Sequence, residues 1–155
     1  MTRWFGRSLA AFAAMAVLGH GAAGAQVPDP FARQLAQTLA QADSVQNDYG
    51  YSRAAGPFAG GLPQGAIRRF PVMLRSGQPY RAVGVCDTRC GDLDLRLYDA
   101  NGNLVTEDVL ADALPVLQFN PQSTGAHTIE VIMAQCAARP CYFAFNVYSR
   151  QSGDW

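Results

Sequence analysis

Lysine is absent from this sequence, so all 12 basic residues are arginine, and they are balanced by 12 acidic residues to a formal net charge of zero. A chain without a basic excess lacks the electrostatic footprint of nucleic-acid-binding proteins. Apolar runs approaching the roughly 20 residues of a membrane-spanning helix are also missing. We therefore expect no nucleic-acid partner, and no membrane span in the chain beyond residue 25.

The first 25 residues have the three-part order of a secretory signal peptide. Arg3 and Arg7 supply a basic start, residues 9–18 form a short apolar run, and Ala23-Gly24-Ala25 is a small-residue cleavage site. The apolar run is shorter than a membrane anchor needs. The pattern predicts an exported protein, periplasmic or secreted, that is cleaved after residue 25.

Only four cysteines are present, and all lie in the exported part, at Cys86, Cys90, Cys136 and Cys141. An even number in an oxidising compartment indicates disulfides. We favour pairing Cys86 with Cys90 and Cys136 with Cys141, because each pair brackets a short turn-like stretch. A zinc site built from all four is the alternative, although zinc sites usually show a C-x2-C spacing.

Residues 26–49 are predicted to hold one amphipathic helix. Asp29 suits the N-cap and Pro30 the first helical position, and Phe31, Leu35 and Leu39 recur at helical spacing. Polar residues Gln34, Gln37, Gln41 and Asp43 are assigned to the other face, and Ala42 and Val45 extend the apolar one. This helix either covers an edge or face of the domain or docks a partner through its apolar residues.

Five glycines and two prolines interrupt residues 50–66, which predicts a linker or an ordered arm. From residue 67 to 150 apolar residues recur every second position, as in Phe70, Val72 and Leu74, and turn residues follow every 8–12 positions. We therefore predict a mainly β fold, an antiparallel β-sandwich of seven or eight strands with one N-terminal helix.

Three segments resemble the bacterial pre-peptidase C-terminal (PPC) domain. They are residues 77–80 (GQPY), residues 92–99 (DLDLRLYD) with the following Asn101-Gly102-Asn103, and residues 125–131 (GAHTIEV). The family usually has Tyr at the position of His127, and the four cysteines are extra to its pattern. The resemblance implies a jelly-roll-like sandwich in a stand-alone exported form. It also implies a binding or accessory role, since no peptidase domain precedes the sandwich in this chain.

Candidate catalytic residues are scarce. His127 is the one histidine beyond residue 25, and it shares a strand face with Ile129 and Val131, as a packing residue would. No serine stands in a G-x-S-x-G elbow, and oxidised cysteines offer no thiol nucleophile. We expect no catalytic residue, with a hydrolase as the minor alternative.

Carboxylates cluster between residues 87 and 112, and hard cations such as Ca²⁺ prefer several oxygen ligands. The first candidates for a calcium site are Asp92, Asp94, Asp99 and Asn101. The alternative is that these acids cap turns and pair with nearby arginines.

Aromatic residues crowd the last predicted strand. Phe143, Phe145 and Val147 share one face and are expected in the core. Tyr142 and Tyr148 fall on the opposite face, where they are candidate binding residues for a sugar or a protein partner.

Taken together, the sequence favours an exported, non-enzymatic binding or accessory module that acts in the cell envelope or outside the cell. An envelope protein or a glycan is the expected partner. The alternatives are a calcium-stabilised structural envelope protein and a peptidase-associated regulator or hydrolase.

Overall fold

The computed structural model describes residues 26–150, so the predicted signal peptide lies outside the described residues. One helix is followed by eight strands. Their bounds are α1 Asp29–Asp48, β1 Tyr51–Leu62, β2 Ile67–Leu74, β3 Tyr80–Cys86, β4 Cys90–Tyr98, β5 Leu104–Asp108, β6 Val116–Phe119, β7 Gly125–Cys136 and β8 Cys141–Arg150. Within this range, the helix is too polar to cross a membrane.

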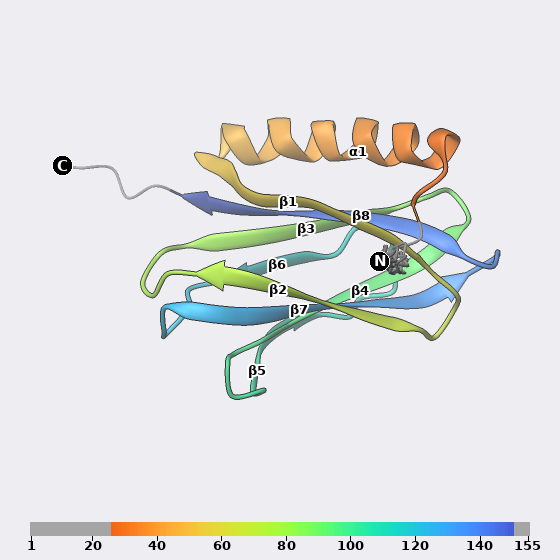
Figure 1. The fold of residues 1–155 in the computed structure, drawn as a ribbon. Coiled ribbons are helices and arrows are strands. Elements are labelled where there is room, and N and C mark those ends of the chain that lie inside the picture. The colour runs from red at the N-terminus through yellow and green to blue at the C-terminus, as the bar shows by residue number, and fades with distance from the viewer. Residues whose placement is uncertain (1–25, 151–155) are drawn as a thin grey trace, which may run out of the picture.

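The strands form two antiparallel four-stranded sheets, ordered β1-β8-β3-β6 and β2-β7-β4-β5. Strand pairs are nested, with β4 beside β5, β3 beside β6, β2 beside β7 and β1 beside β8. A long antiparallel ribbon rolled onto itself gives this order, which is that of an eight-stranded jelly roll. Figure 1 shows the two layers, and the predicted β-sandwich is confirmed.

The core lies between the sheets and follows the period-two pattern. Leu93, Leu95 and Leu97 of β4 are buried, while the residues between them face outward. The same alternation puts Ile129, Val131 and Met133 of β7 and Phe143, Phe145 and Val147 of β8 inside. Because side chains alternate across a strand, each sheet has one buried face and one outer face.

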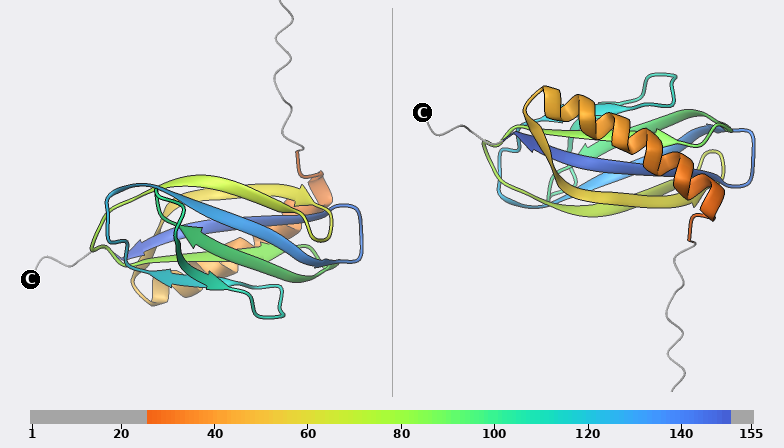
Figure 2. Two further views of the ribbon diagram at one scale, coloured as in Figure 1. Left: turned by 90° about the horizontal axis from the view of Figure 1, so that it is seen from below. Right: turned by 90° about the horizontal axis from the view of Figure 1, so that it is seen from above.

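The outer faces of the two sheets differ. Helix α1 lies across the outer face of β1-β8-β3-β6 (Figure 2), which we call the covered sheet. Leu35 and Leu39 pack there against Val85 of β3 and Ala144 of β8. The expectation that the helix covers the domain is therefore confirmed. The alternative of partner docking through Leu35 and Leu39 is wrong, because both side chains are buried in the fold.

The ends of α1 depart from the prediction in two details. Pro28 is the N-cap, and its carbonyl accepts the amides of Phe31 and Ala32, so Asp29 is the first helical residue. At the other end Asp43 and Gln46 face the sheet, while Val45 is about half exposed. Positions 35, 39, 43 and 46 lie on one helical face, so Asp43 and Gln46 face the sheet and Val45 does not.

Of the two alternatives for residues 50–66, the ordered arm holds and the linker does not: Tyr51–Leu62 is β1, an edge strand of the covered sheet paired with β8. The ladder has two register shifts, between Arg53 and Ala55 and between Ala55 and Phe58, and Gly56 lies within the second. Gly56 has φ +107°, and a Cβ there would lie 2.6 Å from Asn146 Oδ1. Glycine is thus required where β1 approaches β8 most closely.

Candidate functional site

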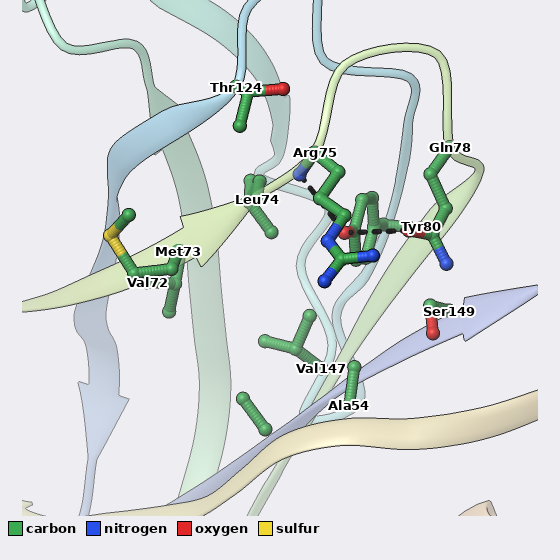
Figure 3. Close-up of a pocket in the computed structure, with 11 residues that line it drawn as sticks. Ala54, Val72, Met73, Leu74, Arg75, Gln78, Tyr80, Thr124, Val147 and Ser149 are labelled. Atoms are coloured by element: carbon green, nitrogen blue, oxygen red, sulfur yellow. Dashed lines mark hydrogen bonds between the residues drawn. The ribbon is translucent and has the colours of Figure 1, made fainter.

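A cleft opens into the sandwich between strands β1 and β2, with a volume of about 440 Å³. These two consecutive strands belong to opposite sheets, so no ladder of hydrogen bonds closes the gap between them. Figure 3 shows the residues around the cleft. They are Ala54, Ala55, Val72, Met73, Leu74, Arg75, Gln78, Tyr80, Thr124, Val147 and Ser149.

The inner wall of the cleft is apolar. Val72 and Leu74 are the inward residues of β2, and Val147 is an inward residue of β8. All three belong to the main core. The opposite wall is formed by Ala54 and Ala55, next to the register shifts of β1. Ala54 is exposed, and Ala55 is half-buried and packs against the main core.

The mouth of the cleft is polar. Tyr80 Oη accepts the backbone amide of Arg75 at 3.1 Å and donates to Gln78 Oε1 at 3.2 Å. Across the turn, Thr124 Oγ1 accepts the Ser76 amide at 3.0 Å. These contacts hold the β2–β3 turn in a defined position while the Arg75 side chain remains exposed.

The side chains that line this cleft are apolar or uncharged, with one exception. The lining residues include no His, Cys, Asp or Glu, and Arg75 is their single charged member. The lining residues therefore include no general base that could pair with a nucleophile. An apolar wall with a few polar groups at the rim is the usual composition of a ligand pocket.

Tyr142 and Tyr148, the predicted binding residues, lie under helix α1. Tyr148 is completely buried, and its hydroxyl donates to Asp43 Oδ1 at 2.8 Å. Burial and the neighbouring Asp43 raise the pKa of Tyr148. The prediction of an exposed Tyr148 is wrong, because the helix covers the outer face of β8. Tyr142 is half-buried, with its ring centroid 4.9 Å from that of Phe31.

The four calcium candidates fall into two groups. Asp99, beyond the end of β4, accepts hydrogen bonds from the amides of Asn101 and Asn103, both at 2.9 Å. Hydrogen bonds from Asn103 and Asn101 lower the pKa of Asp99. Asp92 lies near the start of β4 and Asp94 at its middle, opposite Gln135 and Ile132 of β7. Through residues 26–150, no three His, Cys, Asp or Glu side chains are grouped to hold a metal.

Asp92 and Asp94 each have one buried carboxylate oxygen, Oδ1, without a hydrogen-bond partner. Desolvation and the charge of Asp92 raise the pKa of Asp94, although Arg96 partly opposes this. Asp99 thus fits the alternative that these acids cap turns or pair with arginines. Asp92 and Asp94 fit that alternative less well.

His127 is buried and faces the core on the same side as Ile129 and Val131, as predicted. Its Nδ1 lies 3.1 Å from the carbonyl oxygen of Gly125. The contacts are those of a packing residue within a strand.

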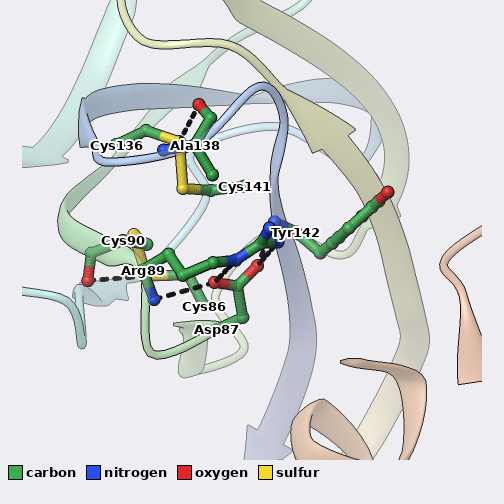
Figure 4. A network of polar contacts seen from close by, with 8 residues as sticks. All are labelled: Cys86, Asp87, Arg89, Cys90, Cys136, Ala138, Cys141 and Tyr142. Atoms are coloured by element: carbon green, nitrogen blue, oxygen red, sulfur yellow. Dashed lines mark hydrogen bonds and ion pairs between the residues drawn. A yellow bond between two sulfur atoms is a disulfide. The ribbon is translucent and has the colours of Figure 1, made fainter. Parts of the chain in front are cut away.

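Both predicted disulfides are present, Cys86–Cys90 and Cys136–Cys141. Cys90 and Cys136 are opposite each other in the β4–β7 ladder, so the two bridges lie at one end of the sandwich (Figure 4). The zinc alternative is wrong, because every cysteine sulfur is bonded to another.

Inside the first disulfide loop, the buried Asp87 carboxylate joins the loop to β8. It accepts the Arg89 side chain at 2.8 and 3.0 Å and the Tyr142 amide of β8 at 2.7 Å (Figure 4). Burial opposes ionisation of Asp87, but the hydrogen bonds from Arg89 and Tyr142 outweigh it and lower its pKa. The Arg89 guanidinium also lies 4.0 Å from the centre of the Phe31 ring. The loop therefore anchors the start of α1.

Within residues 26–150, no helix lies on the outer face of the other sheet, β2-β7-β4-β5, and we call it the open sheet. A charged row crosses it, in which neighbouring strands contribute opposite charges. Its members are Arg69, Glu130, Arg96 and Glu107. Tyr98 adds a hydroxyl 3.3 Å from Glu130, and a hollow of about 380 Å³ lies beside Arg69 and Tyr98.

Sequence reasoning missed the cleft. Val72 and Leu74 were expected in the core, but alternation does not show which core residues reach a gap between the sheets. The one sequence feature that indicates the cleft is Ala54-Ala55-Gly56, where β1 lacks large side chains.

Comparison with known proteins gives no relative for this chain: no protein-family model and no curated protein sequence matches it. The resemblance to the PPC domain therefore stays a prediction.

Proposed function

We propose that this protein is an exported, non-enzymatic binding module that takes a small ligand into the cleft between β1 and β2. The observation that carries the proposal is the cleft itself, an apolar space of about 440 Å³ with a polar mouth. Pockets for small ligands commonly measure about 300–1,000 Å³ and have this distribution of apolar and polar groups.

Two further features support the proposal. The cleft wall is continuous with the core through Val72, Leu74 and Val147, so a ligand there would be desolvated on at least one side. The two disulfides indicate an oxidising environment, as expected for an exported protein.

A binding assay with an uncharged fluorescent probe tests this function. N-phenyl-1-naphthylamine gains fluorescence in an apolar site, and we expect saturable binding to the oxidised protein. Ala54→Trp should fill the cleft from an exposed position and weaken binding at least tenfold. Ala59→Trp is the matched control, because Ala59 is also exposed on β1 but does not line the cleft.

Absence of saturable binding to the unmodified protein would contradict the proposal. Equal binding by the two tryptophan variants would also contradict it, since the probe would then occupy another place. Circular dichroism of both variants establishes that the fold is retained.

A further inference from the structure

The charge at the mouth of the cleft identifies the class of ligand. We infer that the cleft takes an amphipathic carboxylate, whose aliphatic chain lies against Val72, Leu74 and Val147 and whose carboxylate pairs with Arg75. This inference rests on the proposed binding function and adds the chemistry of the ligand.

Arg75 is free to bind an anion. The ion pairs found within residues 26–150 are formed by other arginines, namely Arg53, Arg69, Arg89 and Arg96. Among residues 26–150, the elements that line the cleft place no acid beside Arg75: β1 contributes alanines, β8 contributes Val147 and Ser149, and β3 contributes Tyr80. A guanidinium with this exposure matches a carboxylate through two parallel hydrogen bonds.

The neighbouring polar groups also favour an acceptor ligand. Gln78 Oε1 is occupied by the Tyr80 hydroxyl, so the Gln78 side-chain amide has its N–H groups left to donate. Figure 3 shows Gln78 and Arg75 on the same side of the cleft mouth. Donors gathered beside an unpaired cation suit an anion better than a neutral polar group.

The walls select an aliphatic chain over a sugar. Below the mouth the lining side chains are Val72, Leu74, Val147 and two alanines, which offer no hydrogen bonds to hydroxyl groups. Burying polar hydroxyls there without partners is unfavourable, whereas each methylene removed from water tightens binding about fourfold. Affinity should therefore rise with chain length until the chain fills the cleft.

A matched pair of ligands tests the inference. Octanoate and 1-octanol have the same number of carbon atoms but differ in charge, and each is titrated by displacement of N-phenyl-1-naphthylamine. We expect octanoate to bind at least tenfold tighter than octanol to the unmodified protein. Octanoate should bind about as weakly as octanol to Arg75→Gln, and butanoate and hexanoate should bind progressively more weakly than octanoate.

Two control variants separate this site from general effects. Arg33→Gln removes the same charge from an exposed position on α1 and should leave octanoate binding unchanged. Ala54→Trp should abolish the binding of both ligands. Added NaCl should weaken octanoate but not octanol, because screening acts on the ion pair.

The possible failures are distinguishable. If octanol and octanoate bind the unmodified protein equally, or Arg75→Gln leaves octanoate unaffected, the carboxylate inference is overturned and the binding function stands. If neither ligand nor the fluorescent probe binds, the binding function fails as well. If Ala54→Trp retains octanoate, the carboxylate occupies another site and the inference is overturned.

Discussion

The covered sheet and the open sheet seal their outer faces in different ways. On the covered sheet α1 buries Leu35 and Leu39 at its N-terminal half, and its C-terminal half places Asp43 over the buried Tyr148 and Asn146. The described part of the chain places no helix on the open sheet, yet Glu130 is only 3% exposed. Its neighbours Arg69, Arg96 and Tyr98 shield it.

This difference shows two solutions to one problem. A packed helix stabilises its sheet through apolar burial, which is large and insensitive to salt. A row of long side chains hides its central carboxylate at the cost of exposing its arginines, and exposed ion pairs contribute little to stability. Stability should therefore depend on the covered face much more than on the open face.

The largest expected effect is the removal of a helix anchor. Leu39→Ala should lower the free energy of unfolding by about 2–5 kcal/mol, because a buried leucine is lost from the contact with the covered sheet. Met73→Ala, on the open sheet, changes a side chain that is 74% exposed, and its effect should stay within about 0.5 kcal/mol. Urea unfolding of both variants measures the difference, and equal losses would contradict the comparison.

The polar contacts of the two faces should also differ in their contribution to the free energy of unfolding, by less than the apolar contacts do. Asp43→Ala leaves the Tyr148 hydroxyl and the Asn146 amide without their shared acceptor beneath the helix, which should cost about 1–3 kcal/mol. Glu107→Ala removes an ion pair with Arg96 in which both side chains are 38% exposed, and should cost about 0–1 kcal/mol.

Urea unfolding at low and high salt checks both polar variants. The effect of Glu107→Ala should shrink at high salt, while that of Asp43→Ala should persist. Asp43 also forms an ion pair with the partly exposed Arg53, which salt screens, so only a complete loss of the Asp43→Ala effect at high salt would contradict the assignment of its other contacts to a buried site.

The elements that the sequence predicted are those controlled by local patterns. Alternation placed Leu93, Leu95 and Leu97 in the core, and short spacing predicted both disulfides. Helical spacing placed Leu35 and Leu39 on one face of α1. Each of these features depends on residues that are near one another in the chain.

The features that sequence reasoning missed depend on contacts between distant segments. Tyr148 lies on an outer strand face, and only the position of α1 shows that this face is buried. Residues 50–66 contain turn-forming glycines, yet pairing with β8 makes them a strand, and Gly56 allows the close approach. The cleft arises from a gap between two sheets, which no single segment encodes.

A smaller effect with a distinctive pH dependence is expected at Asp94. Its pKa is raised by burial and by Asp92, so the folded state binds the proton more tightly than the unfolded state. Stability should consequently fall as the pH rises from the ordinary aspartate pKa through the raised value. Asp94→Asn removes this penalty and should raise the Tm at pH 7 by about 1–3 °C, with the gain disappearing at low pH.

The pH dependence of stability at Asp87 is expected to have the opposite sign to that at Asp94. Its pKa is lowered, so its contribution is present at neutral pH and is lost as the pH falls through that lowered value. Asp87→Asn should therefore lower the Tm at pH 7. Calorimetric melting curves from pH 3 to pH 7 compare the two variants, and shifts of equal sign would contradict the assignment.

The smallest expected effect concerns calcium on the open sheet. A calcium ion prefers about six to eight oxygen ligands, but Asp99 already holds its own turn, while Asp92 lies near the start of β4 and Asp94 at its middle. We therefore expect the same Tm in excess CaCl2 and in EDTA. A calcium-dependent rise that disappears in Asp94→Asn and persists in Asp99→Asn would contradict this expectation. It would show that the partnerless oxygens of Asp92 and Asp94 bind the ion together with ligands from outside their strand.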